Sequence, residues 1–215
     1  MAGRIRPLNV PSLRRCLLEI HRDLFVIDRH ALPYVPEEPL SHLEKMVLIL
    51  EDRRYFCHPG FDPIACIREL VRVLTLRPYG GASTVAMQFV RTATDYKEKT
   101  IKRKLYEMFL SILVQFRYSK LDILRSYLQC AFFGSGLRGA DRASKNRFGK
   151  TQHELTLQEA AFIAAMLVYP KPLIPTPLWL TKVSRRADYA VRLHPLFEQS
   201  LDKFQCRKPF QRTRR

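Results

Sequence analysis

Helix-start signals recur along this chain and constrain it to a mainly α-helical fold. Ser41 and Glu44 form a capping box, in which each side chain can accept a hydrogen bond from the other residue's backbone amide. Thr156 and Glu159 repeat the pattern before the most apolar stretch of the chain. Apolar residues after such signals recur at intervals of three and four, as one face of a helix requires. We therefore expect a mainly α-helical domain.

The same signals divide the chain into segments. We expect helices at about 41–51, 62–74, 84–92, 99–116, 122–132, from 156 to about 169, and at 184–193. Strand signals are weak and confined to short pieces such as 24–27. Between the helices we expect a turn at 78–81, a glycine-punctuated loop at 134–139 and a proline-rich exit at 170–177.

The charge balance predicts an anionic partner. Lys and Arg number 37 against 20 Asp and Glu, which gives a formal net charge of +17. Such an excess is typical of proteins that bind nucleic acid, an anionic membrane surface or phosphate-bearing substrates. Composition alone does not choose among these three classes of partner.

Neither the cysteines nor the apolar segments indicate a disulfide framework or a membrane span. The five cysteines are scattered without a C-x-x-C pair. The longest apolar stretch, 160–169, is shorter than the roughly 20 residues that cross a bilayer. Charged residues interrupt 12–27, so we expect no signal peptide or transmembrane helix in this chain. At a membrane, it would act by surface contact or through a partner.

The segment 51–62 concentrates chemically active residues at the end of the first expected helix. It reads E-D-R-R-Y-F-C-H-P-G-F-D. Taken alone, such a segment is typical of a solvated, charged turn that caps a helix. It also resembles the first motif of glycosyltransferase family 51, E-D-R-R-F-Y-x-H-x-G-x-D, with the two aromatic residues exchanged.

Four further segments resemble the other motifs of that family, in the family's order. They are Gly81–Gln88 (G-G-S-T-I-T-Q-Q in the family), Arg103–Glu107 (R-K-x-x-E), Lys120–Gln129 (K-x-x-I-L-x-x-Y-L-N) and 148–161 (F-G-K, then L-T-x-x-E-A-A). The resemblance implies a mainly α, lysozyme-like glycosyltransferase domain with a small membrane-facing lobe. We expect that domain at 37–195, between a partly ordered basic segment at 1–36 and a basic tail at 196–215.

The resemblance implies a peptidoglycan glycosyltransferase that polymerises lipid II into glycan strands by an inverting displacement of undecaprenyl pyrophosphate. The acceptor hydroxyl is a poor nucleophile, so a carboxylate must take its proton. The family's base maps to Glu51. The family's second glutamate, which assists the leaving group and sometimes holds a metal, maps to Glu107, so Mg²⁺ or Mn²⁺ is a candidate cofactor. On the residues alone, Glu107 is equally a helix-face partner of Arg103.

Arginine and lysine side chains can neutralise the departing pyrophosphate. Arg91 stands where the family usually has lysine, which keeps the charge but changes the geometry. The substrate-binding residues that the resemblance implies are Arg53, Arg54, Ser83, Thr84, Gln88, Arg91, Lys99, Arg103 and Lys104.

Several positions depart from the family pattern. Ala86 and Met87 replace a threonine and a glutamine, from which we expect a donor site with fewer polar contacts. The other departures are Thr92, Gln115, Gln129 and Arg147. They leave open a weakly active or inactive paralogue that binds lipid-linked precursor or a cell-wall partner. A nucleic-acid-binding protein is the least favoured alternative, because it would need neither Glu51 nor Glu107.

The resemblance also implies a location and partners. We expect the extracytoplasmic face of the bacterial cytoplasmic membrane, with lipid II and the growing glycan strand as ligands. Without a span of its own in the sequence, the chain would reach that face by peripheral contact with anionic lipid. A membrane-anchored cell-wall protein is the alternative means of attachment.

Overall fold

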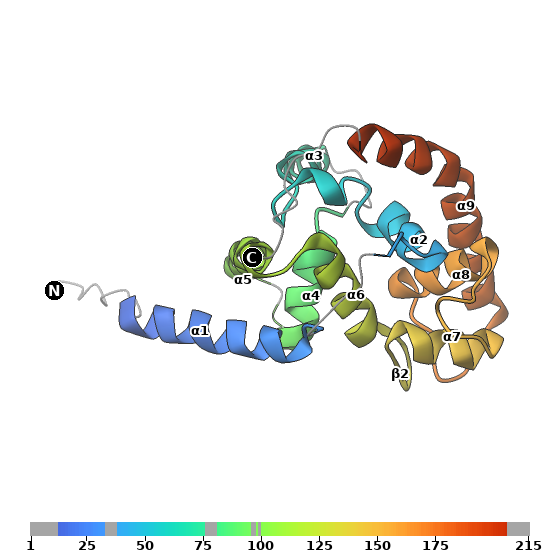
Figure 1. Ribbon diagram of the computed structural model, residues 1–215, viewed down its shortest axis with the longest axis horizontal. Coiled ribbons are helices and arrows are strands. Elements are labelled where there is room, and N and C mark those ends of the chain that lie inside the picture. Colours follow the sequence, from blue (N-terminus) through green and yellow to red (C-terminus); the bar gives the residue numbers. More distant parts are fainter. Residues whose placement is uncertain (1–12, 33–37, 76–80, 96–97, 99, 206–215) are drawn as a thin grey trace, which may run out of the picture.

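Helices dominate the computed structural model, which describes residues 13–32, 38–75, 81–95, 98 and 100–205 (Figure 1). The helices are α1 (Leu13–His30), α2 (His42–Glu51), α3 (Pro63–Leu74), α4 (Val85–Thr94), α5 (Ile101–Arg117), α6 (Lys120–Cys130), α7 (Ala140–Phe148), α8 (Leu157–Val168) and α9 (Pro177–Gln205). A 3₁₀ turn at Tyr55–Cys57 and a two-stranded hairpin, β1 (Phe132–Gly134) and β2 (Leu137–Arg138), complete the described elements. The prediction of a mainly α fold is confirmed.

The core is built around α8, which packs against both α2 and α9. Every residue from Ala160 to Met166 is buried, so this helix is covered on all sides. Both predicted capping boxes are present: Ser41 accepts from the Glu44 amide at 3.3 Å, and Thr156 accepts from the Glu159 amide at 3.4 Å. A covered helix must be apolar all round, which explains the composition of α8.

A second layer consists of α4 packed against α5 and α6 (Figure 1). The first three residues of α4, Val85, Ala86 and Met87, are fully buried. The two departures from the family pattern at Ala86 and Met87 therefore lie in the core, and neither side chain reaches the surface. Both side chains therefore belong to the core of this chain, and the expected loss of polar contacts in the donor site stays a prediction.

The structure corrects the predicted elements at both ends of the chain. The segment 24–27, predicted to be a short strand, lies inside α1, where Ile27 is buried in the core. The last helix was predicted over 184–193 but runs from Pro177 to Gln205, with Pro195 inside it. Proline is tolerated in the first turn of a helix. Pro177, which was predicted to be the last residue of the proline-rich exit, is therefore the first residue of α9. Residues 1–12 and 206–215, in the predicted basic end segments, lie outside the described residues.

The predicted loop at 134–139 instead contains most of the hairpin and leads into a helix, α7, that the sequence pattern did not reveal. The hairpin is tied to the start of the proline-rich exit, because Lys171 donates from its amide to the Phe133 carbonyl at 2.8 Å. α7 is short and polar, with only Ala140, Ala143 and Ser144 buried, so it has little apolar periodicity to detect. Residues 78–80 of the predicted turn at 78–81 lie outside the described part of the chain.

No helix in the described ranges combines the length and the apolar character needed to cross a bilayer.

Gly60 allows the loop between α2 and α3 to pass against the backbone of α5. Its φ is +110°, and a Cβ there would lie 2.6 Å from the carbonyl oxygen of Ser111. The Gly60 carbonyl also accepts a hydrogen bond from the hydroxyl of Thr84, the residue that caps α4. Gly60 therefore brings the loop between α2 and α3 against the middle of α5 and the start of α4, near the residues singled out for chemistry.

We predict that Gly60→Ala lowers the free energy of unfolding by about 3 kcal/mol, because the new methyl group combines a disfavoured φ with a clash against backbone. Gly81→Ala is the matched control, since a Cβ at Gly81 would meet nothing within 4 Å; its effect should stay within about 1 kcal/mol. Denaturant titration of both variants tests this. Equal unfolding midpoints for the two would contradict the close approach at Gly60.

Candidate active site

Glu51 is the last residue of α2, and its carboxylate is held by a side chain of α4. Gln88 donates from Nε2 to Oε2 of Glu51 at 2.5 Å. The Oε1 atom of Gln88 in turn accepts from the hydroxyl of Tyr127, on α6, at 2.5 Å. Three helices thus meet at one partly buried carboxylate.

The surroundings of Glu51 make its carboxylate a stronger base than an exposed one. Burial raises the pKa of Glu51 above its ordinary value, and the hydrogen bond from Gln88 and the charge of Arg186 oppose that rise only in part. The neighbouring charge of Asp52 adds to the rise. A carboxylate with a raised pKa is better matched to taking a proton near neutral pH.

Asp52 fixes the end of α2 relative to the start of α4. Its side chain is buried, and its oxygens accept from Nε2 of His58 at 3.0 and 3.1 Å and from the amide of Val85 at 3.2 Å. The Lys120 ammonium donates to the His58 carbonyl at 2.6 Å, and burial lowers the pKa of Lys120 to about 8. Asp52 therefore sets the distance between Glu51 and α4.

Glu107, on α5, is the centre of a second cluster. Its side chain is 3% exposed and accepts two hydrogen bonds from Arg91, at 3.0 and 2.8 Å. Nη2 of Arg103 lies 2.7 Å from Oε1 of the same carboxylate. The one-turn pairing of Glu107 with Arg103, the alternative that the sequence left open, is present, and Arg91 adds a two-point contact from α4.

Two further polar residues adjoin this cluster. The Lys104 ammonium donates to Oγ of Ser83 at 2.5 Å. Burial and the nearby charge of Arg91 lower the pKa of Lys104. Arg91 keeps 44% of its side chain exposed, so it can meet a ligand while it pairs with Glu107. We call Ser83, Arg91, Arg103, Lys104 and Glu107 the cation cluster.

α4 links Glu51 to the cation cluster. Gln88 and Arg91 stand three residues apart on this helix, so they lie on the same face in neighbouring turns. Gln88 holds Glu51, and Arg91 holds Glu107. The structure therefore brings a partly buried carboxylate and a group of cationic side chains to adjacent positions along one helix.

The remaining predicted site residues lie elsewhere or have structural partners. Thr84 is buried and caps α4 by accepting from the Met87 amide at 3.2 Å. Arg53 donates to the Ile49 carbonyl and, at 2.7 Å, to the Tyr189 hydroxyl on α9. Arg54 lies 3.6 Å from a carboxylate oxygen of Asp62. Lys99 is outside the described residues.

Three residues near Glu51 were not among the predicted site residues: Asp52, described above, Tyr127 and Arg186. Tyr127 belongs to the segment that resembles the fourth motif, which was a usable signal. Arg186 lies in α9, and its Nη2 donates to the Leu50 carbonyl at 3.2 Å. Only the tertiary packing of α9 against α2 brings Arg186 to this position.

The donor set around Glu107 does not fit a divalent cation. Both of its oxygens already contact guanidinium groups. Within the described ranges, no group of three or more His, Cys, Asp or Glu side chains is placed to hold a metal ion. Mg²⁺ and Mn²⁺ prefer several oxygen ligands and keep bound water, which this arrangement does not offer. Mg²⁺ or Mn²⁺ as cofactor stays a prediction, and no chemical step below depends on one.

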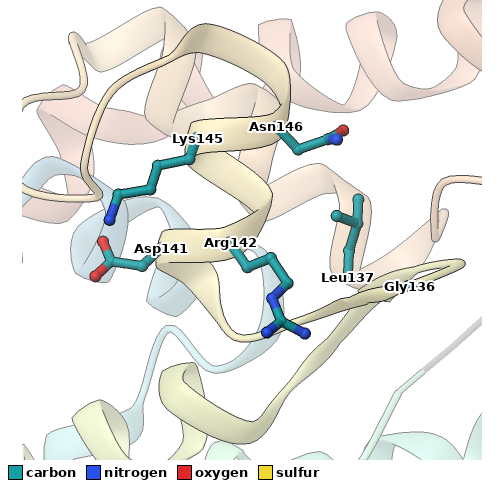
Figure 2. A pocket seen from close by; sticks show the side chains of 6 residues that line it. All are labelled: Gly136, Leu137, Asp141, Arg142, Lys145 and Asn146. Carbon is teal, nitrogen blue, oxygen red and sulfur yellow. The ribbon is translucent and has the colours of Figure 1, made fainter.

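Two cavities, of about 580 and 320 Å³, lie along α7, away from all the predicted site residues. Figure 2 shows Arg142 projecting from α7 toward Gly136 and Leu137 of the hairpin, with Asp141 and Lys145 on the other side of the helix. The larger cavity is open and lined by exposed side chains of both charge signs. None of the hydrogen bonds to Glu51 or Glu107 described above involves a residue that lines these cavities.

Comparison with known proteins supports the interpretation of the motifs. Penicillin-binding protein 1A of Rickettsia prowazekii is 32% identical over 171 residues, which cover 78% of this chain and 22% of that protein. Penicillin-binding protein 2a of Streptococcus pneumoniae is 35% identical over 131 residues, covering 61% and 18%. A Cupriavidus necator protein, provisionally named a transglycosylase, is 35% identical over 145 residues, covering 67% and 63%. The chain thus spans about a fifth of the length of the two penicillin-binding proteins.

The transglycosylase family model matches residues 28–193, from the end of α1 into α9. This range contains Glu51, Glu107 and every described residue of the cation cluster. It also agrees with the lysozyme-like, mainly α architecture that the motifs implied. The chain belongs to the transglycosylase family, glycosyltransferase family 51.

Proposed function

We propose that this chain is a peptidoglycan glycosyltransferase that polymerises lipid II by an inverting displacement of undecaprenyl pyrophosphate. The observation that carries the proposal is that Glu51 and the cation cluster lie against the same face of α4, where Gln88 contacts Glu51 and Arg91 contacts Glu107. The family match and the relatives named above support it. A base beside a cationic surface is the pair of groups that transfer of a pyrophosphate-linked sugar requires.

The chemical step needs one proton acceptor and one place for negative charge. Glu51 takes the proton of the acceptor hydroxyl as that oxygen bonds to the anomeric carbon of the donor sugar. The bond between that carbon and the pyrophosphate oxygen breaks, and the pyrophosphate leaves with its electron pair. A single displacement of this kind inverts the anomeric centre. The leaving group is already anionic, so it needs neutralisation more than protonation.

The cation cluster supplies that neutralisation. The exposed part of Arg91 and the ammonium of Lys104 are the groups best placed to meet the pyrophosphate, with Ser83 as a hydroxyl donor. Glu107 holds Arg91 at two points, which fixes the plane of its guanidinium before substrate arrives. In this proposal Glu107 acts through the cations that it orients. Such preorganisation lowers the cost of meeting charge in the transition state.

Glu51→Gln should abolish polymerisation and leave the fold intact. The amide is isosteric but cannot take a proton, and it removes a charge that burial disfavours, so stability should equal or exceed that of the wild type. Formation of glycan polymer from lipid II in detergent, together with a denaturant titration, measures both effects. Normal polymer from this variant would remove Glu51 from the mechanism. If the wild type binds lipid II without forming polymer, the alternative of an inactive paralogue holds.

Glu107→Gln should lower both activity and stability, in contrast to Glu51→Gln. The substitution removes the ion pair between Glu107 and Arg103, which is 9% exposed, and breaking a buried pair costs about 3 kcal/mol. Loss of the two-point contact with Arg91 should lower kcat, because the cation that meets the departing pyrophosphate is no longer held in place. The same assays measure both quantities. Wild-type stability in this variant would show that Glu107 does not hold the cluster together.

We also propose that the chain works at the outer face of the bacterial cytoplasmic membrane, bound to lipid II and the growing glycan strand. Three neighbouring helices carry large, exposed apolar side chains: Leu13, Leu17, Leu18 and Phe25 on α1, Ile64, Ile67 and Val71 on α3, and Ile101, Leu105, Phe109 and Phe116 on α5. α1 contacts α5, and the loop that precedes α3 lies against Ser111 of α5. Together with the net charge of +17, these faces suit peripheral contact with anionic lipid. A membrane-anchored cell-wall protein stays a predicted partner.

The double substitution Ile64→Glu and Ile67→Glu should weaken binding to phosphatidylglycerol vesicles about tenfold, because two apolar side chains can no longer enter the lipid interface. Leu196→Glu on α9 is the control, since Leu196 is as exposed as Ile67, at 63%, but lies on another helix. Vesicle co-sedimentation measures the effect. Equal loss in both variants, or binding to neutral phosphatidylcholine as tight as to phosphatidylglycerol, would contradict this docking face.

A further inference from the structure

A continuous chain of hydrogen bonds runs from α6 through α4 to the base on α2. The hydroxyl of Tyr127 donates to Oε1 of Gln88 at 2.5 Å, and Nε2 of Gln88 donates to Oε2 of Glu51 at 2.5 Å. Tyr127 is only 4% exposed, so its hydroxyl is shielded from competing water. Burial raises the pKa of Tyr127 well above its ordinary range, which keeps the hydroxyl protonated and available as a donor.

The direction of this chain is set by the Glu51 carboxylate and completed by the Tyr127 hydroxyl. An amide side chain can present either its oxygen or its nitrogen to a neighbour. An ionised carboxylate accepts hydrogen bonds only, so Glu51 is stabilised when Gln88 presents its nitrogen. With Gln88 in this orientation, the Tyr127 hydroxyl donates to the oxygen at the opposite end of the amide and holds that end in place. Without that hydroxyl, the oxygen of Gln88 would lose its partner in a partly buried site.

We propose that Tyr127 is a positioning residue for the catalytic base: through Gln88, it holds Glu51 as an oriented carboxylate ready to accept a proton. The resemblance placed Gln88 among the substrate-binding residues, whereas both ends of its amide are engaged within the protein. Gln88 thus serves the base, and recognition of the pyrophosphate falls to the cation cluster. This inference rests on the proposed role of Glu51 as the base.

Other charges near Glu51 come from the helices packed around it. Asp52 follows it in the chain, and Arg186 faces it from α9; their effects on its pKa are opposite. α8, which packs against α2, carries one ionisable side chain, Glu159, which is held by Lys150 at 2.7 Å. α4 contributes Arg91, which is paired with Glu107. Replacing Tyr127 by phenylalanine alters none of these charges, so its effect on Glu51 can be read separately.

Tyr127→Phe should impair polymerisation at low pH more than at high pH. A weaker hydrogen bond from Gln88 raises the pKa of Glu51 further, so a smaller fraction of the base is ionised on the acidic side. We expect the acidic limb of the kcat/KM profile to move to higher pH, with a loss of about fivefold on that limb and little change on the plateau. Tyr118→Phe is the control, because it removes a hydroxyl that donates to Asp28 at 2.8 Å, on α1.

A second variant separates positioning from a general loss of structure. Gln88→Met keeps the length of the side chain but removes both hydrogen bonds, so it should shift the acidic limb at least as far as Tyr127→Phe. The double variant should shift it no further than Gln88→Met alone, since both residues act through one chain. A uniform loss at every pH in Tyr127→Phe, or additive shifts in the double variant, would overturn the proposal.

A titration of Glu51 without substrate tests the positioning role of Tyr127 independently of activity. Carboxyl ¹³C NMR of glutamate-labelled protein follows each glutamate, and the resonance missing in Glu51→Gln identifies Glu51. The titration midpoint of Glu51 should rise in Tyr127→Phe and stay unchanged in Tyr118→Phe. An unchanged midpoint in Tyr127→Phe refutes the positioning role even if the enzyme polymerises lipid II. A raised midpoint in a protein that forms no polymer would leave the positioning intact and refute the proposed function.

Discussion

The geometry of the site depends on one buried carboxylate, that of Asp52. It accepts hydrogen bonds from the His58 ring and from the Val85 amide, so the end of α2 and the start of α4 share a single anchor. An unpaired buried carboxylate would be costly, and each of these contacts offsets part of that cost. One donor to Asp52 is a backbone amide, that of Val85. The other donor, His58, is held in place by Lys120, which donates a hydrogen bond to its carbonyl. Glu51 therefore lies at a constrained position opposite Gln88.

The surroundings of Glu51 and of Glu107 differ in their electrostatics. Around Glu51, burial and Asp52 disfavour the charge, which keeps the base reactive. Around Glu107, three cationic side chains approach one another, and a single buried carboxylate limits their repulsion. Arginine and lysine side chains are abundant in a protein with a net charge of +17. The harder requirement is to hold them in a fixed arrangement, and Glu107 contacts both Arg91 and Arg103.

Features that depend on residues close together in the sequence, such as helix starts, could be predicted from the sequence. The capping boxes at Ser41 and Thr156 involve residues three apart, so the sequence alone revealed both helix starts. The position of Glu51 at a helix end followed in the same way. The ion pair of Arg91 with Glu107 joins residues that are 16 apart in the sequence and lie on different helices. The hydrogen bond from Tyr127 to Gln88 joins residues that are 39 apart. No periodicity encodes such contacts, because they arise only when α4 packs between α5 and α6.

The burial of Ala86 and Met87 has a consequence for attempts to move this sequence toward its family's usual residues. A threonine and a glutamine at these positions would each bring polar atoms into a fully enclosed space, where a missing hydrogen bond is costly. In this chain, a single reversion at Ala86 or Met87 is therefore expected to lower stability unless a neighbouring core group supplies the hydrogen bond that the new polar side chain needs.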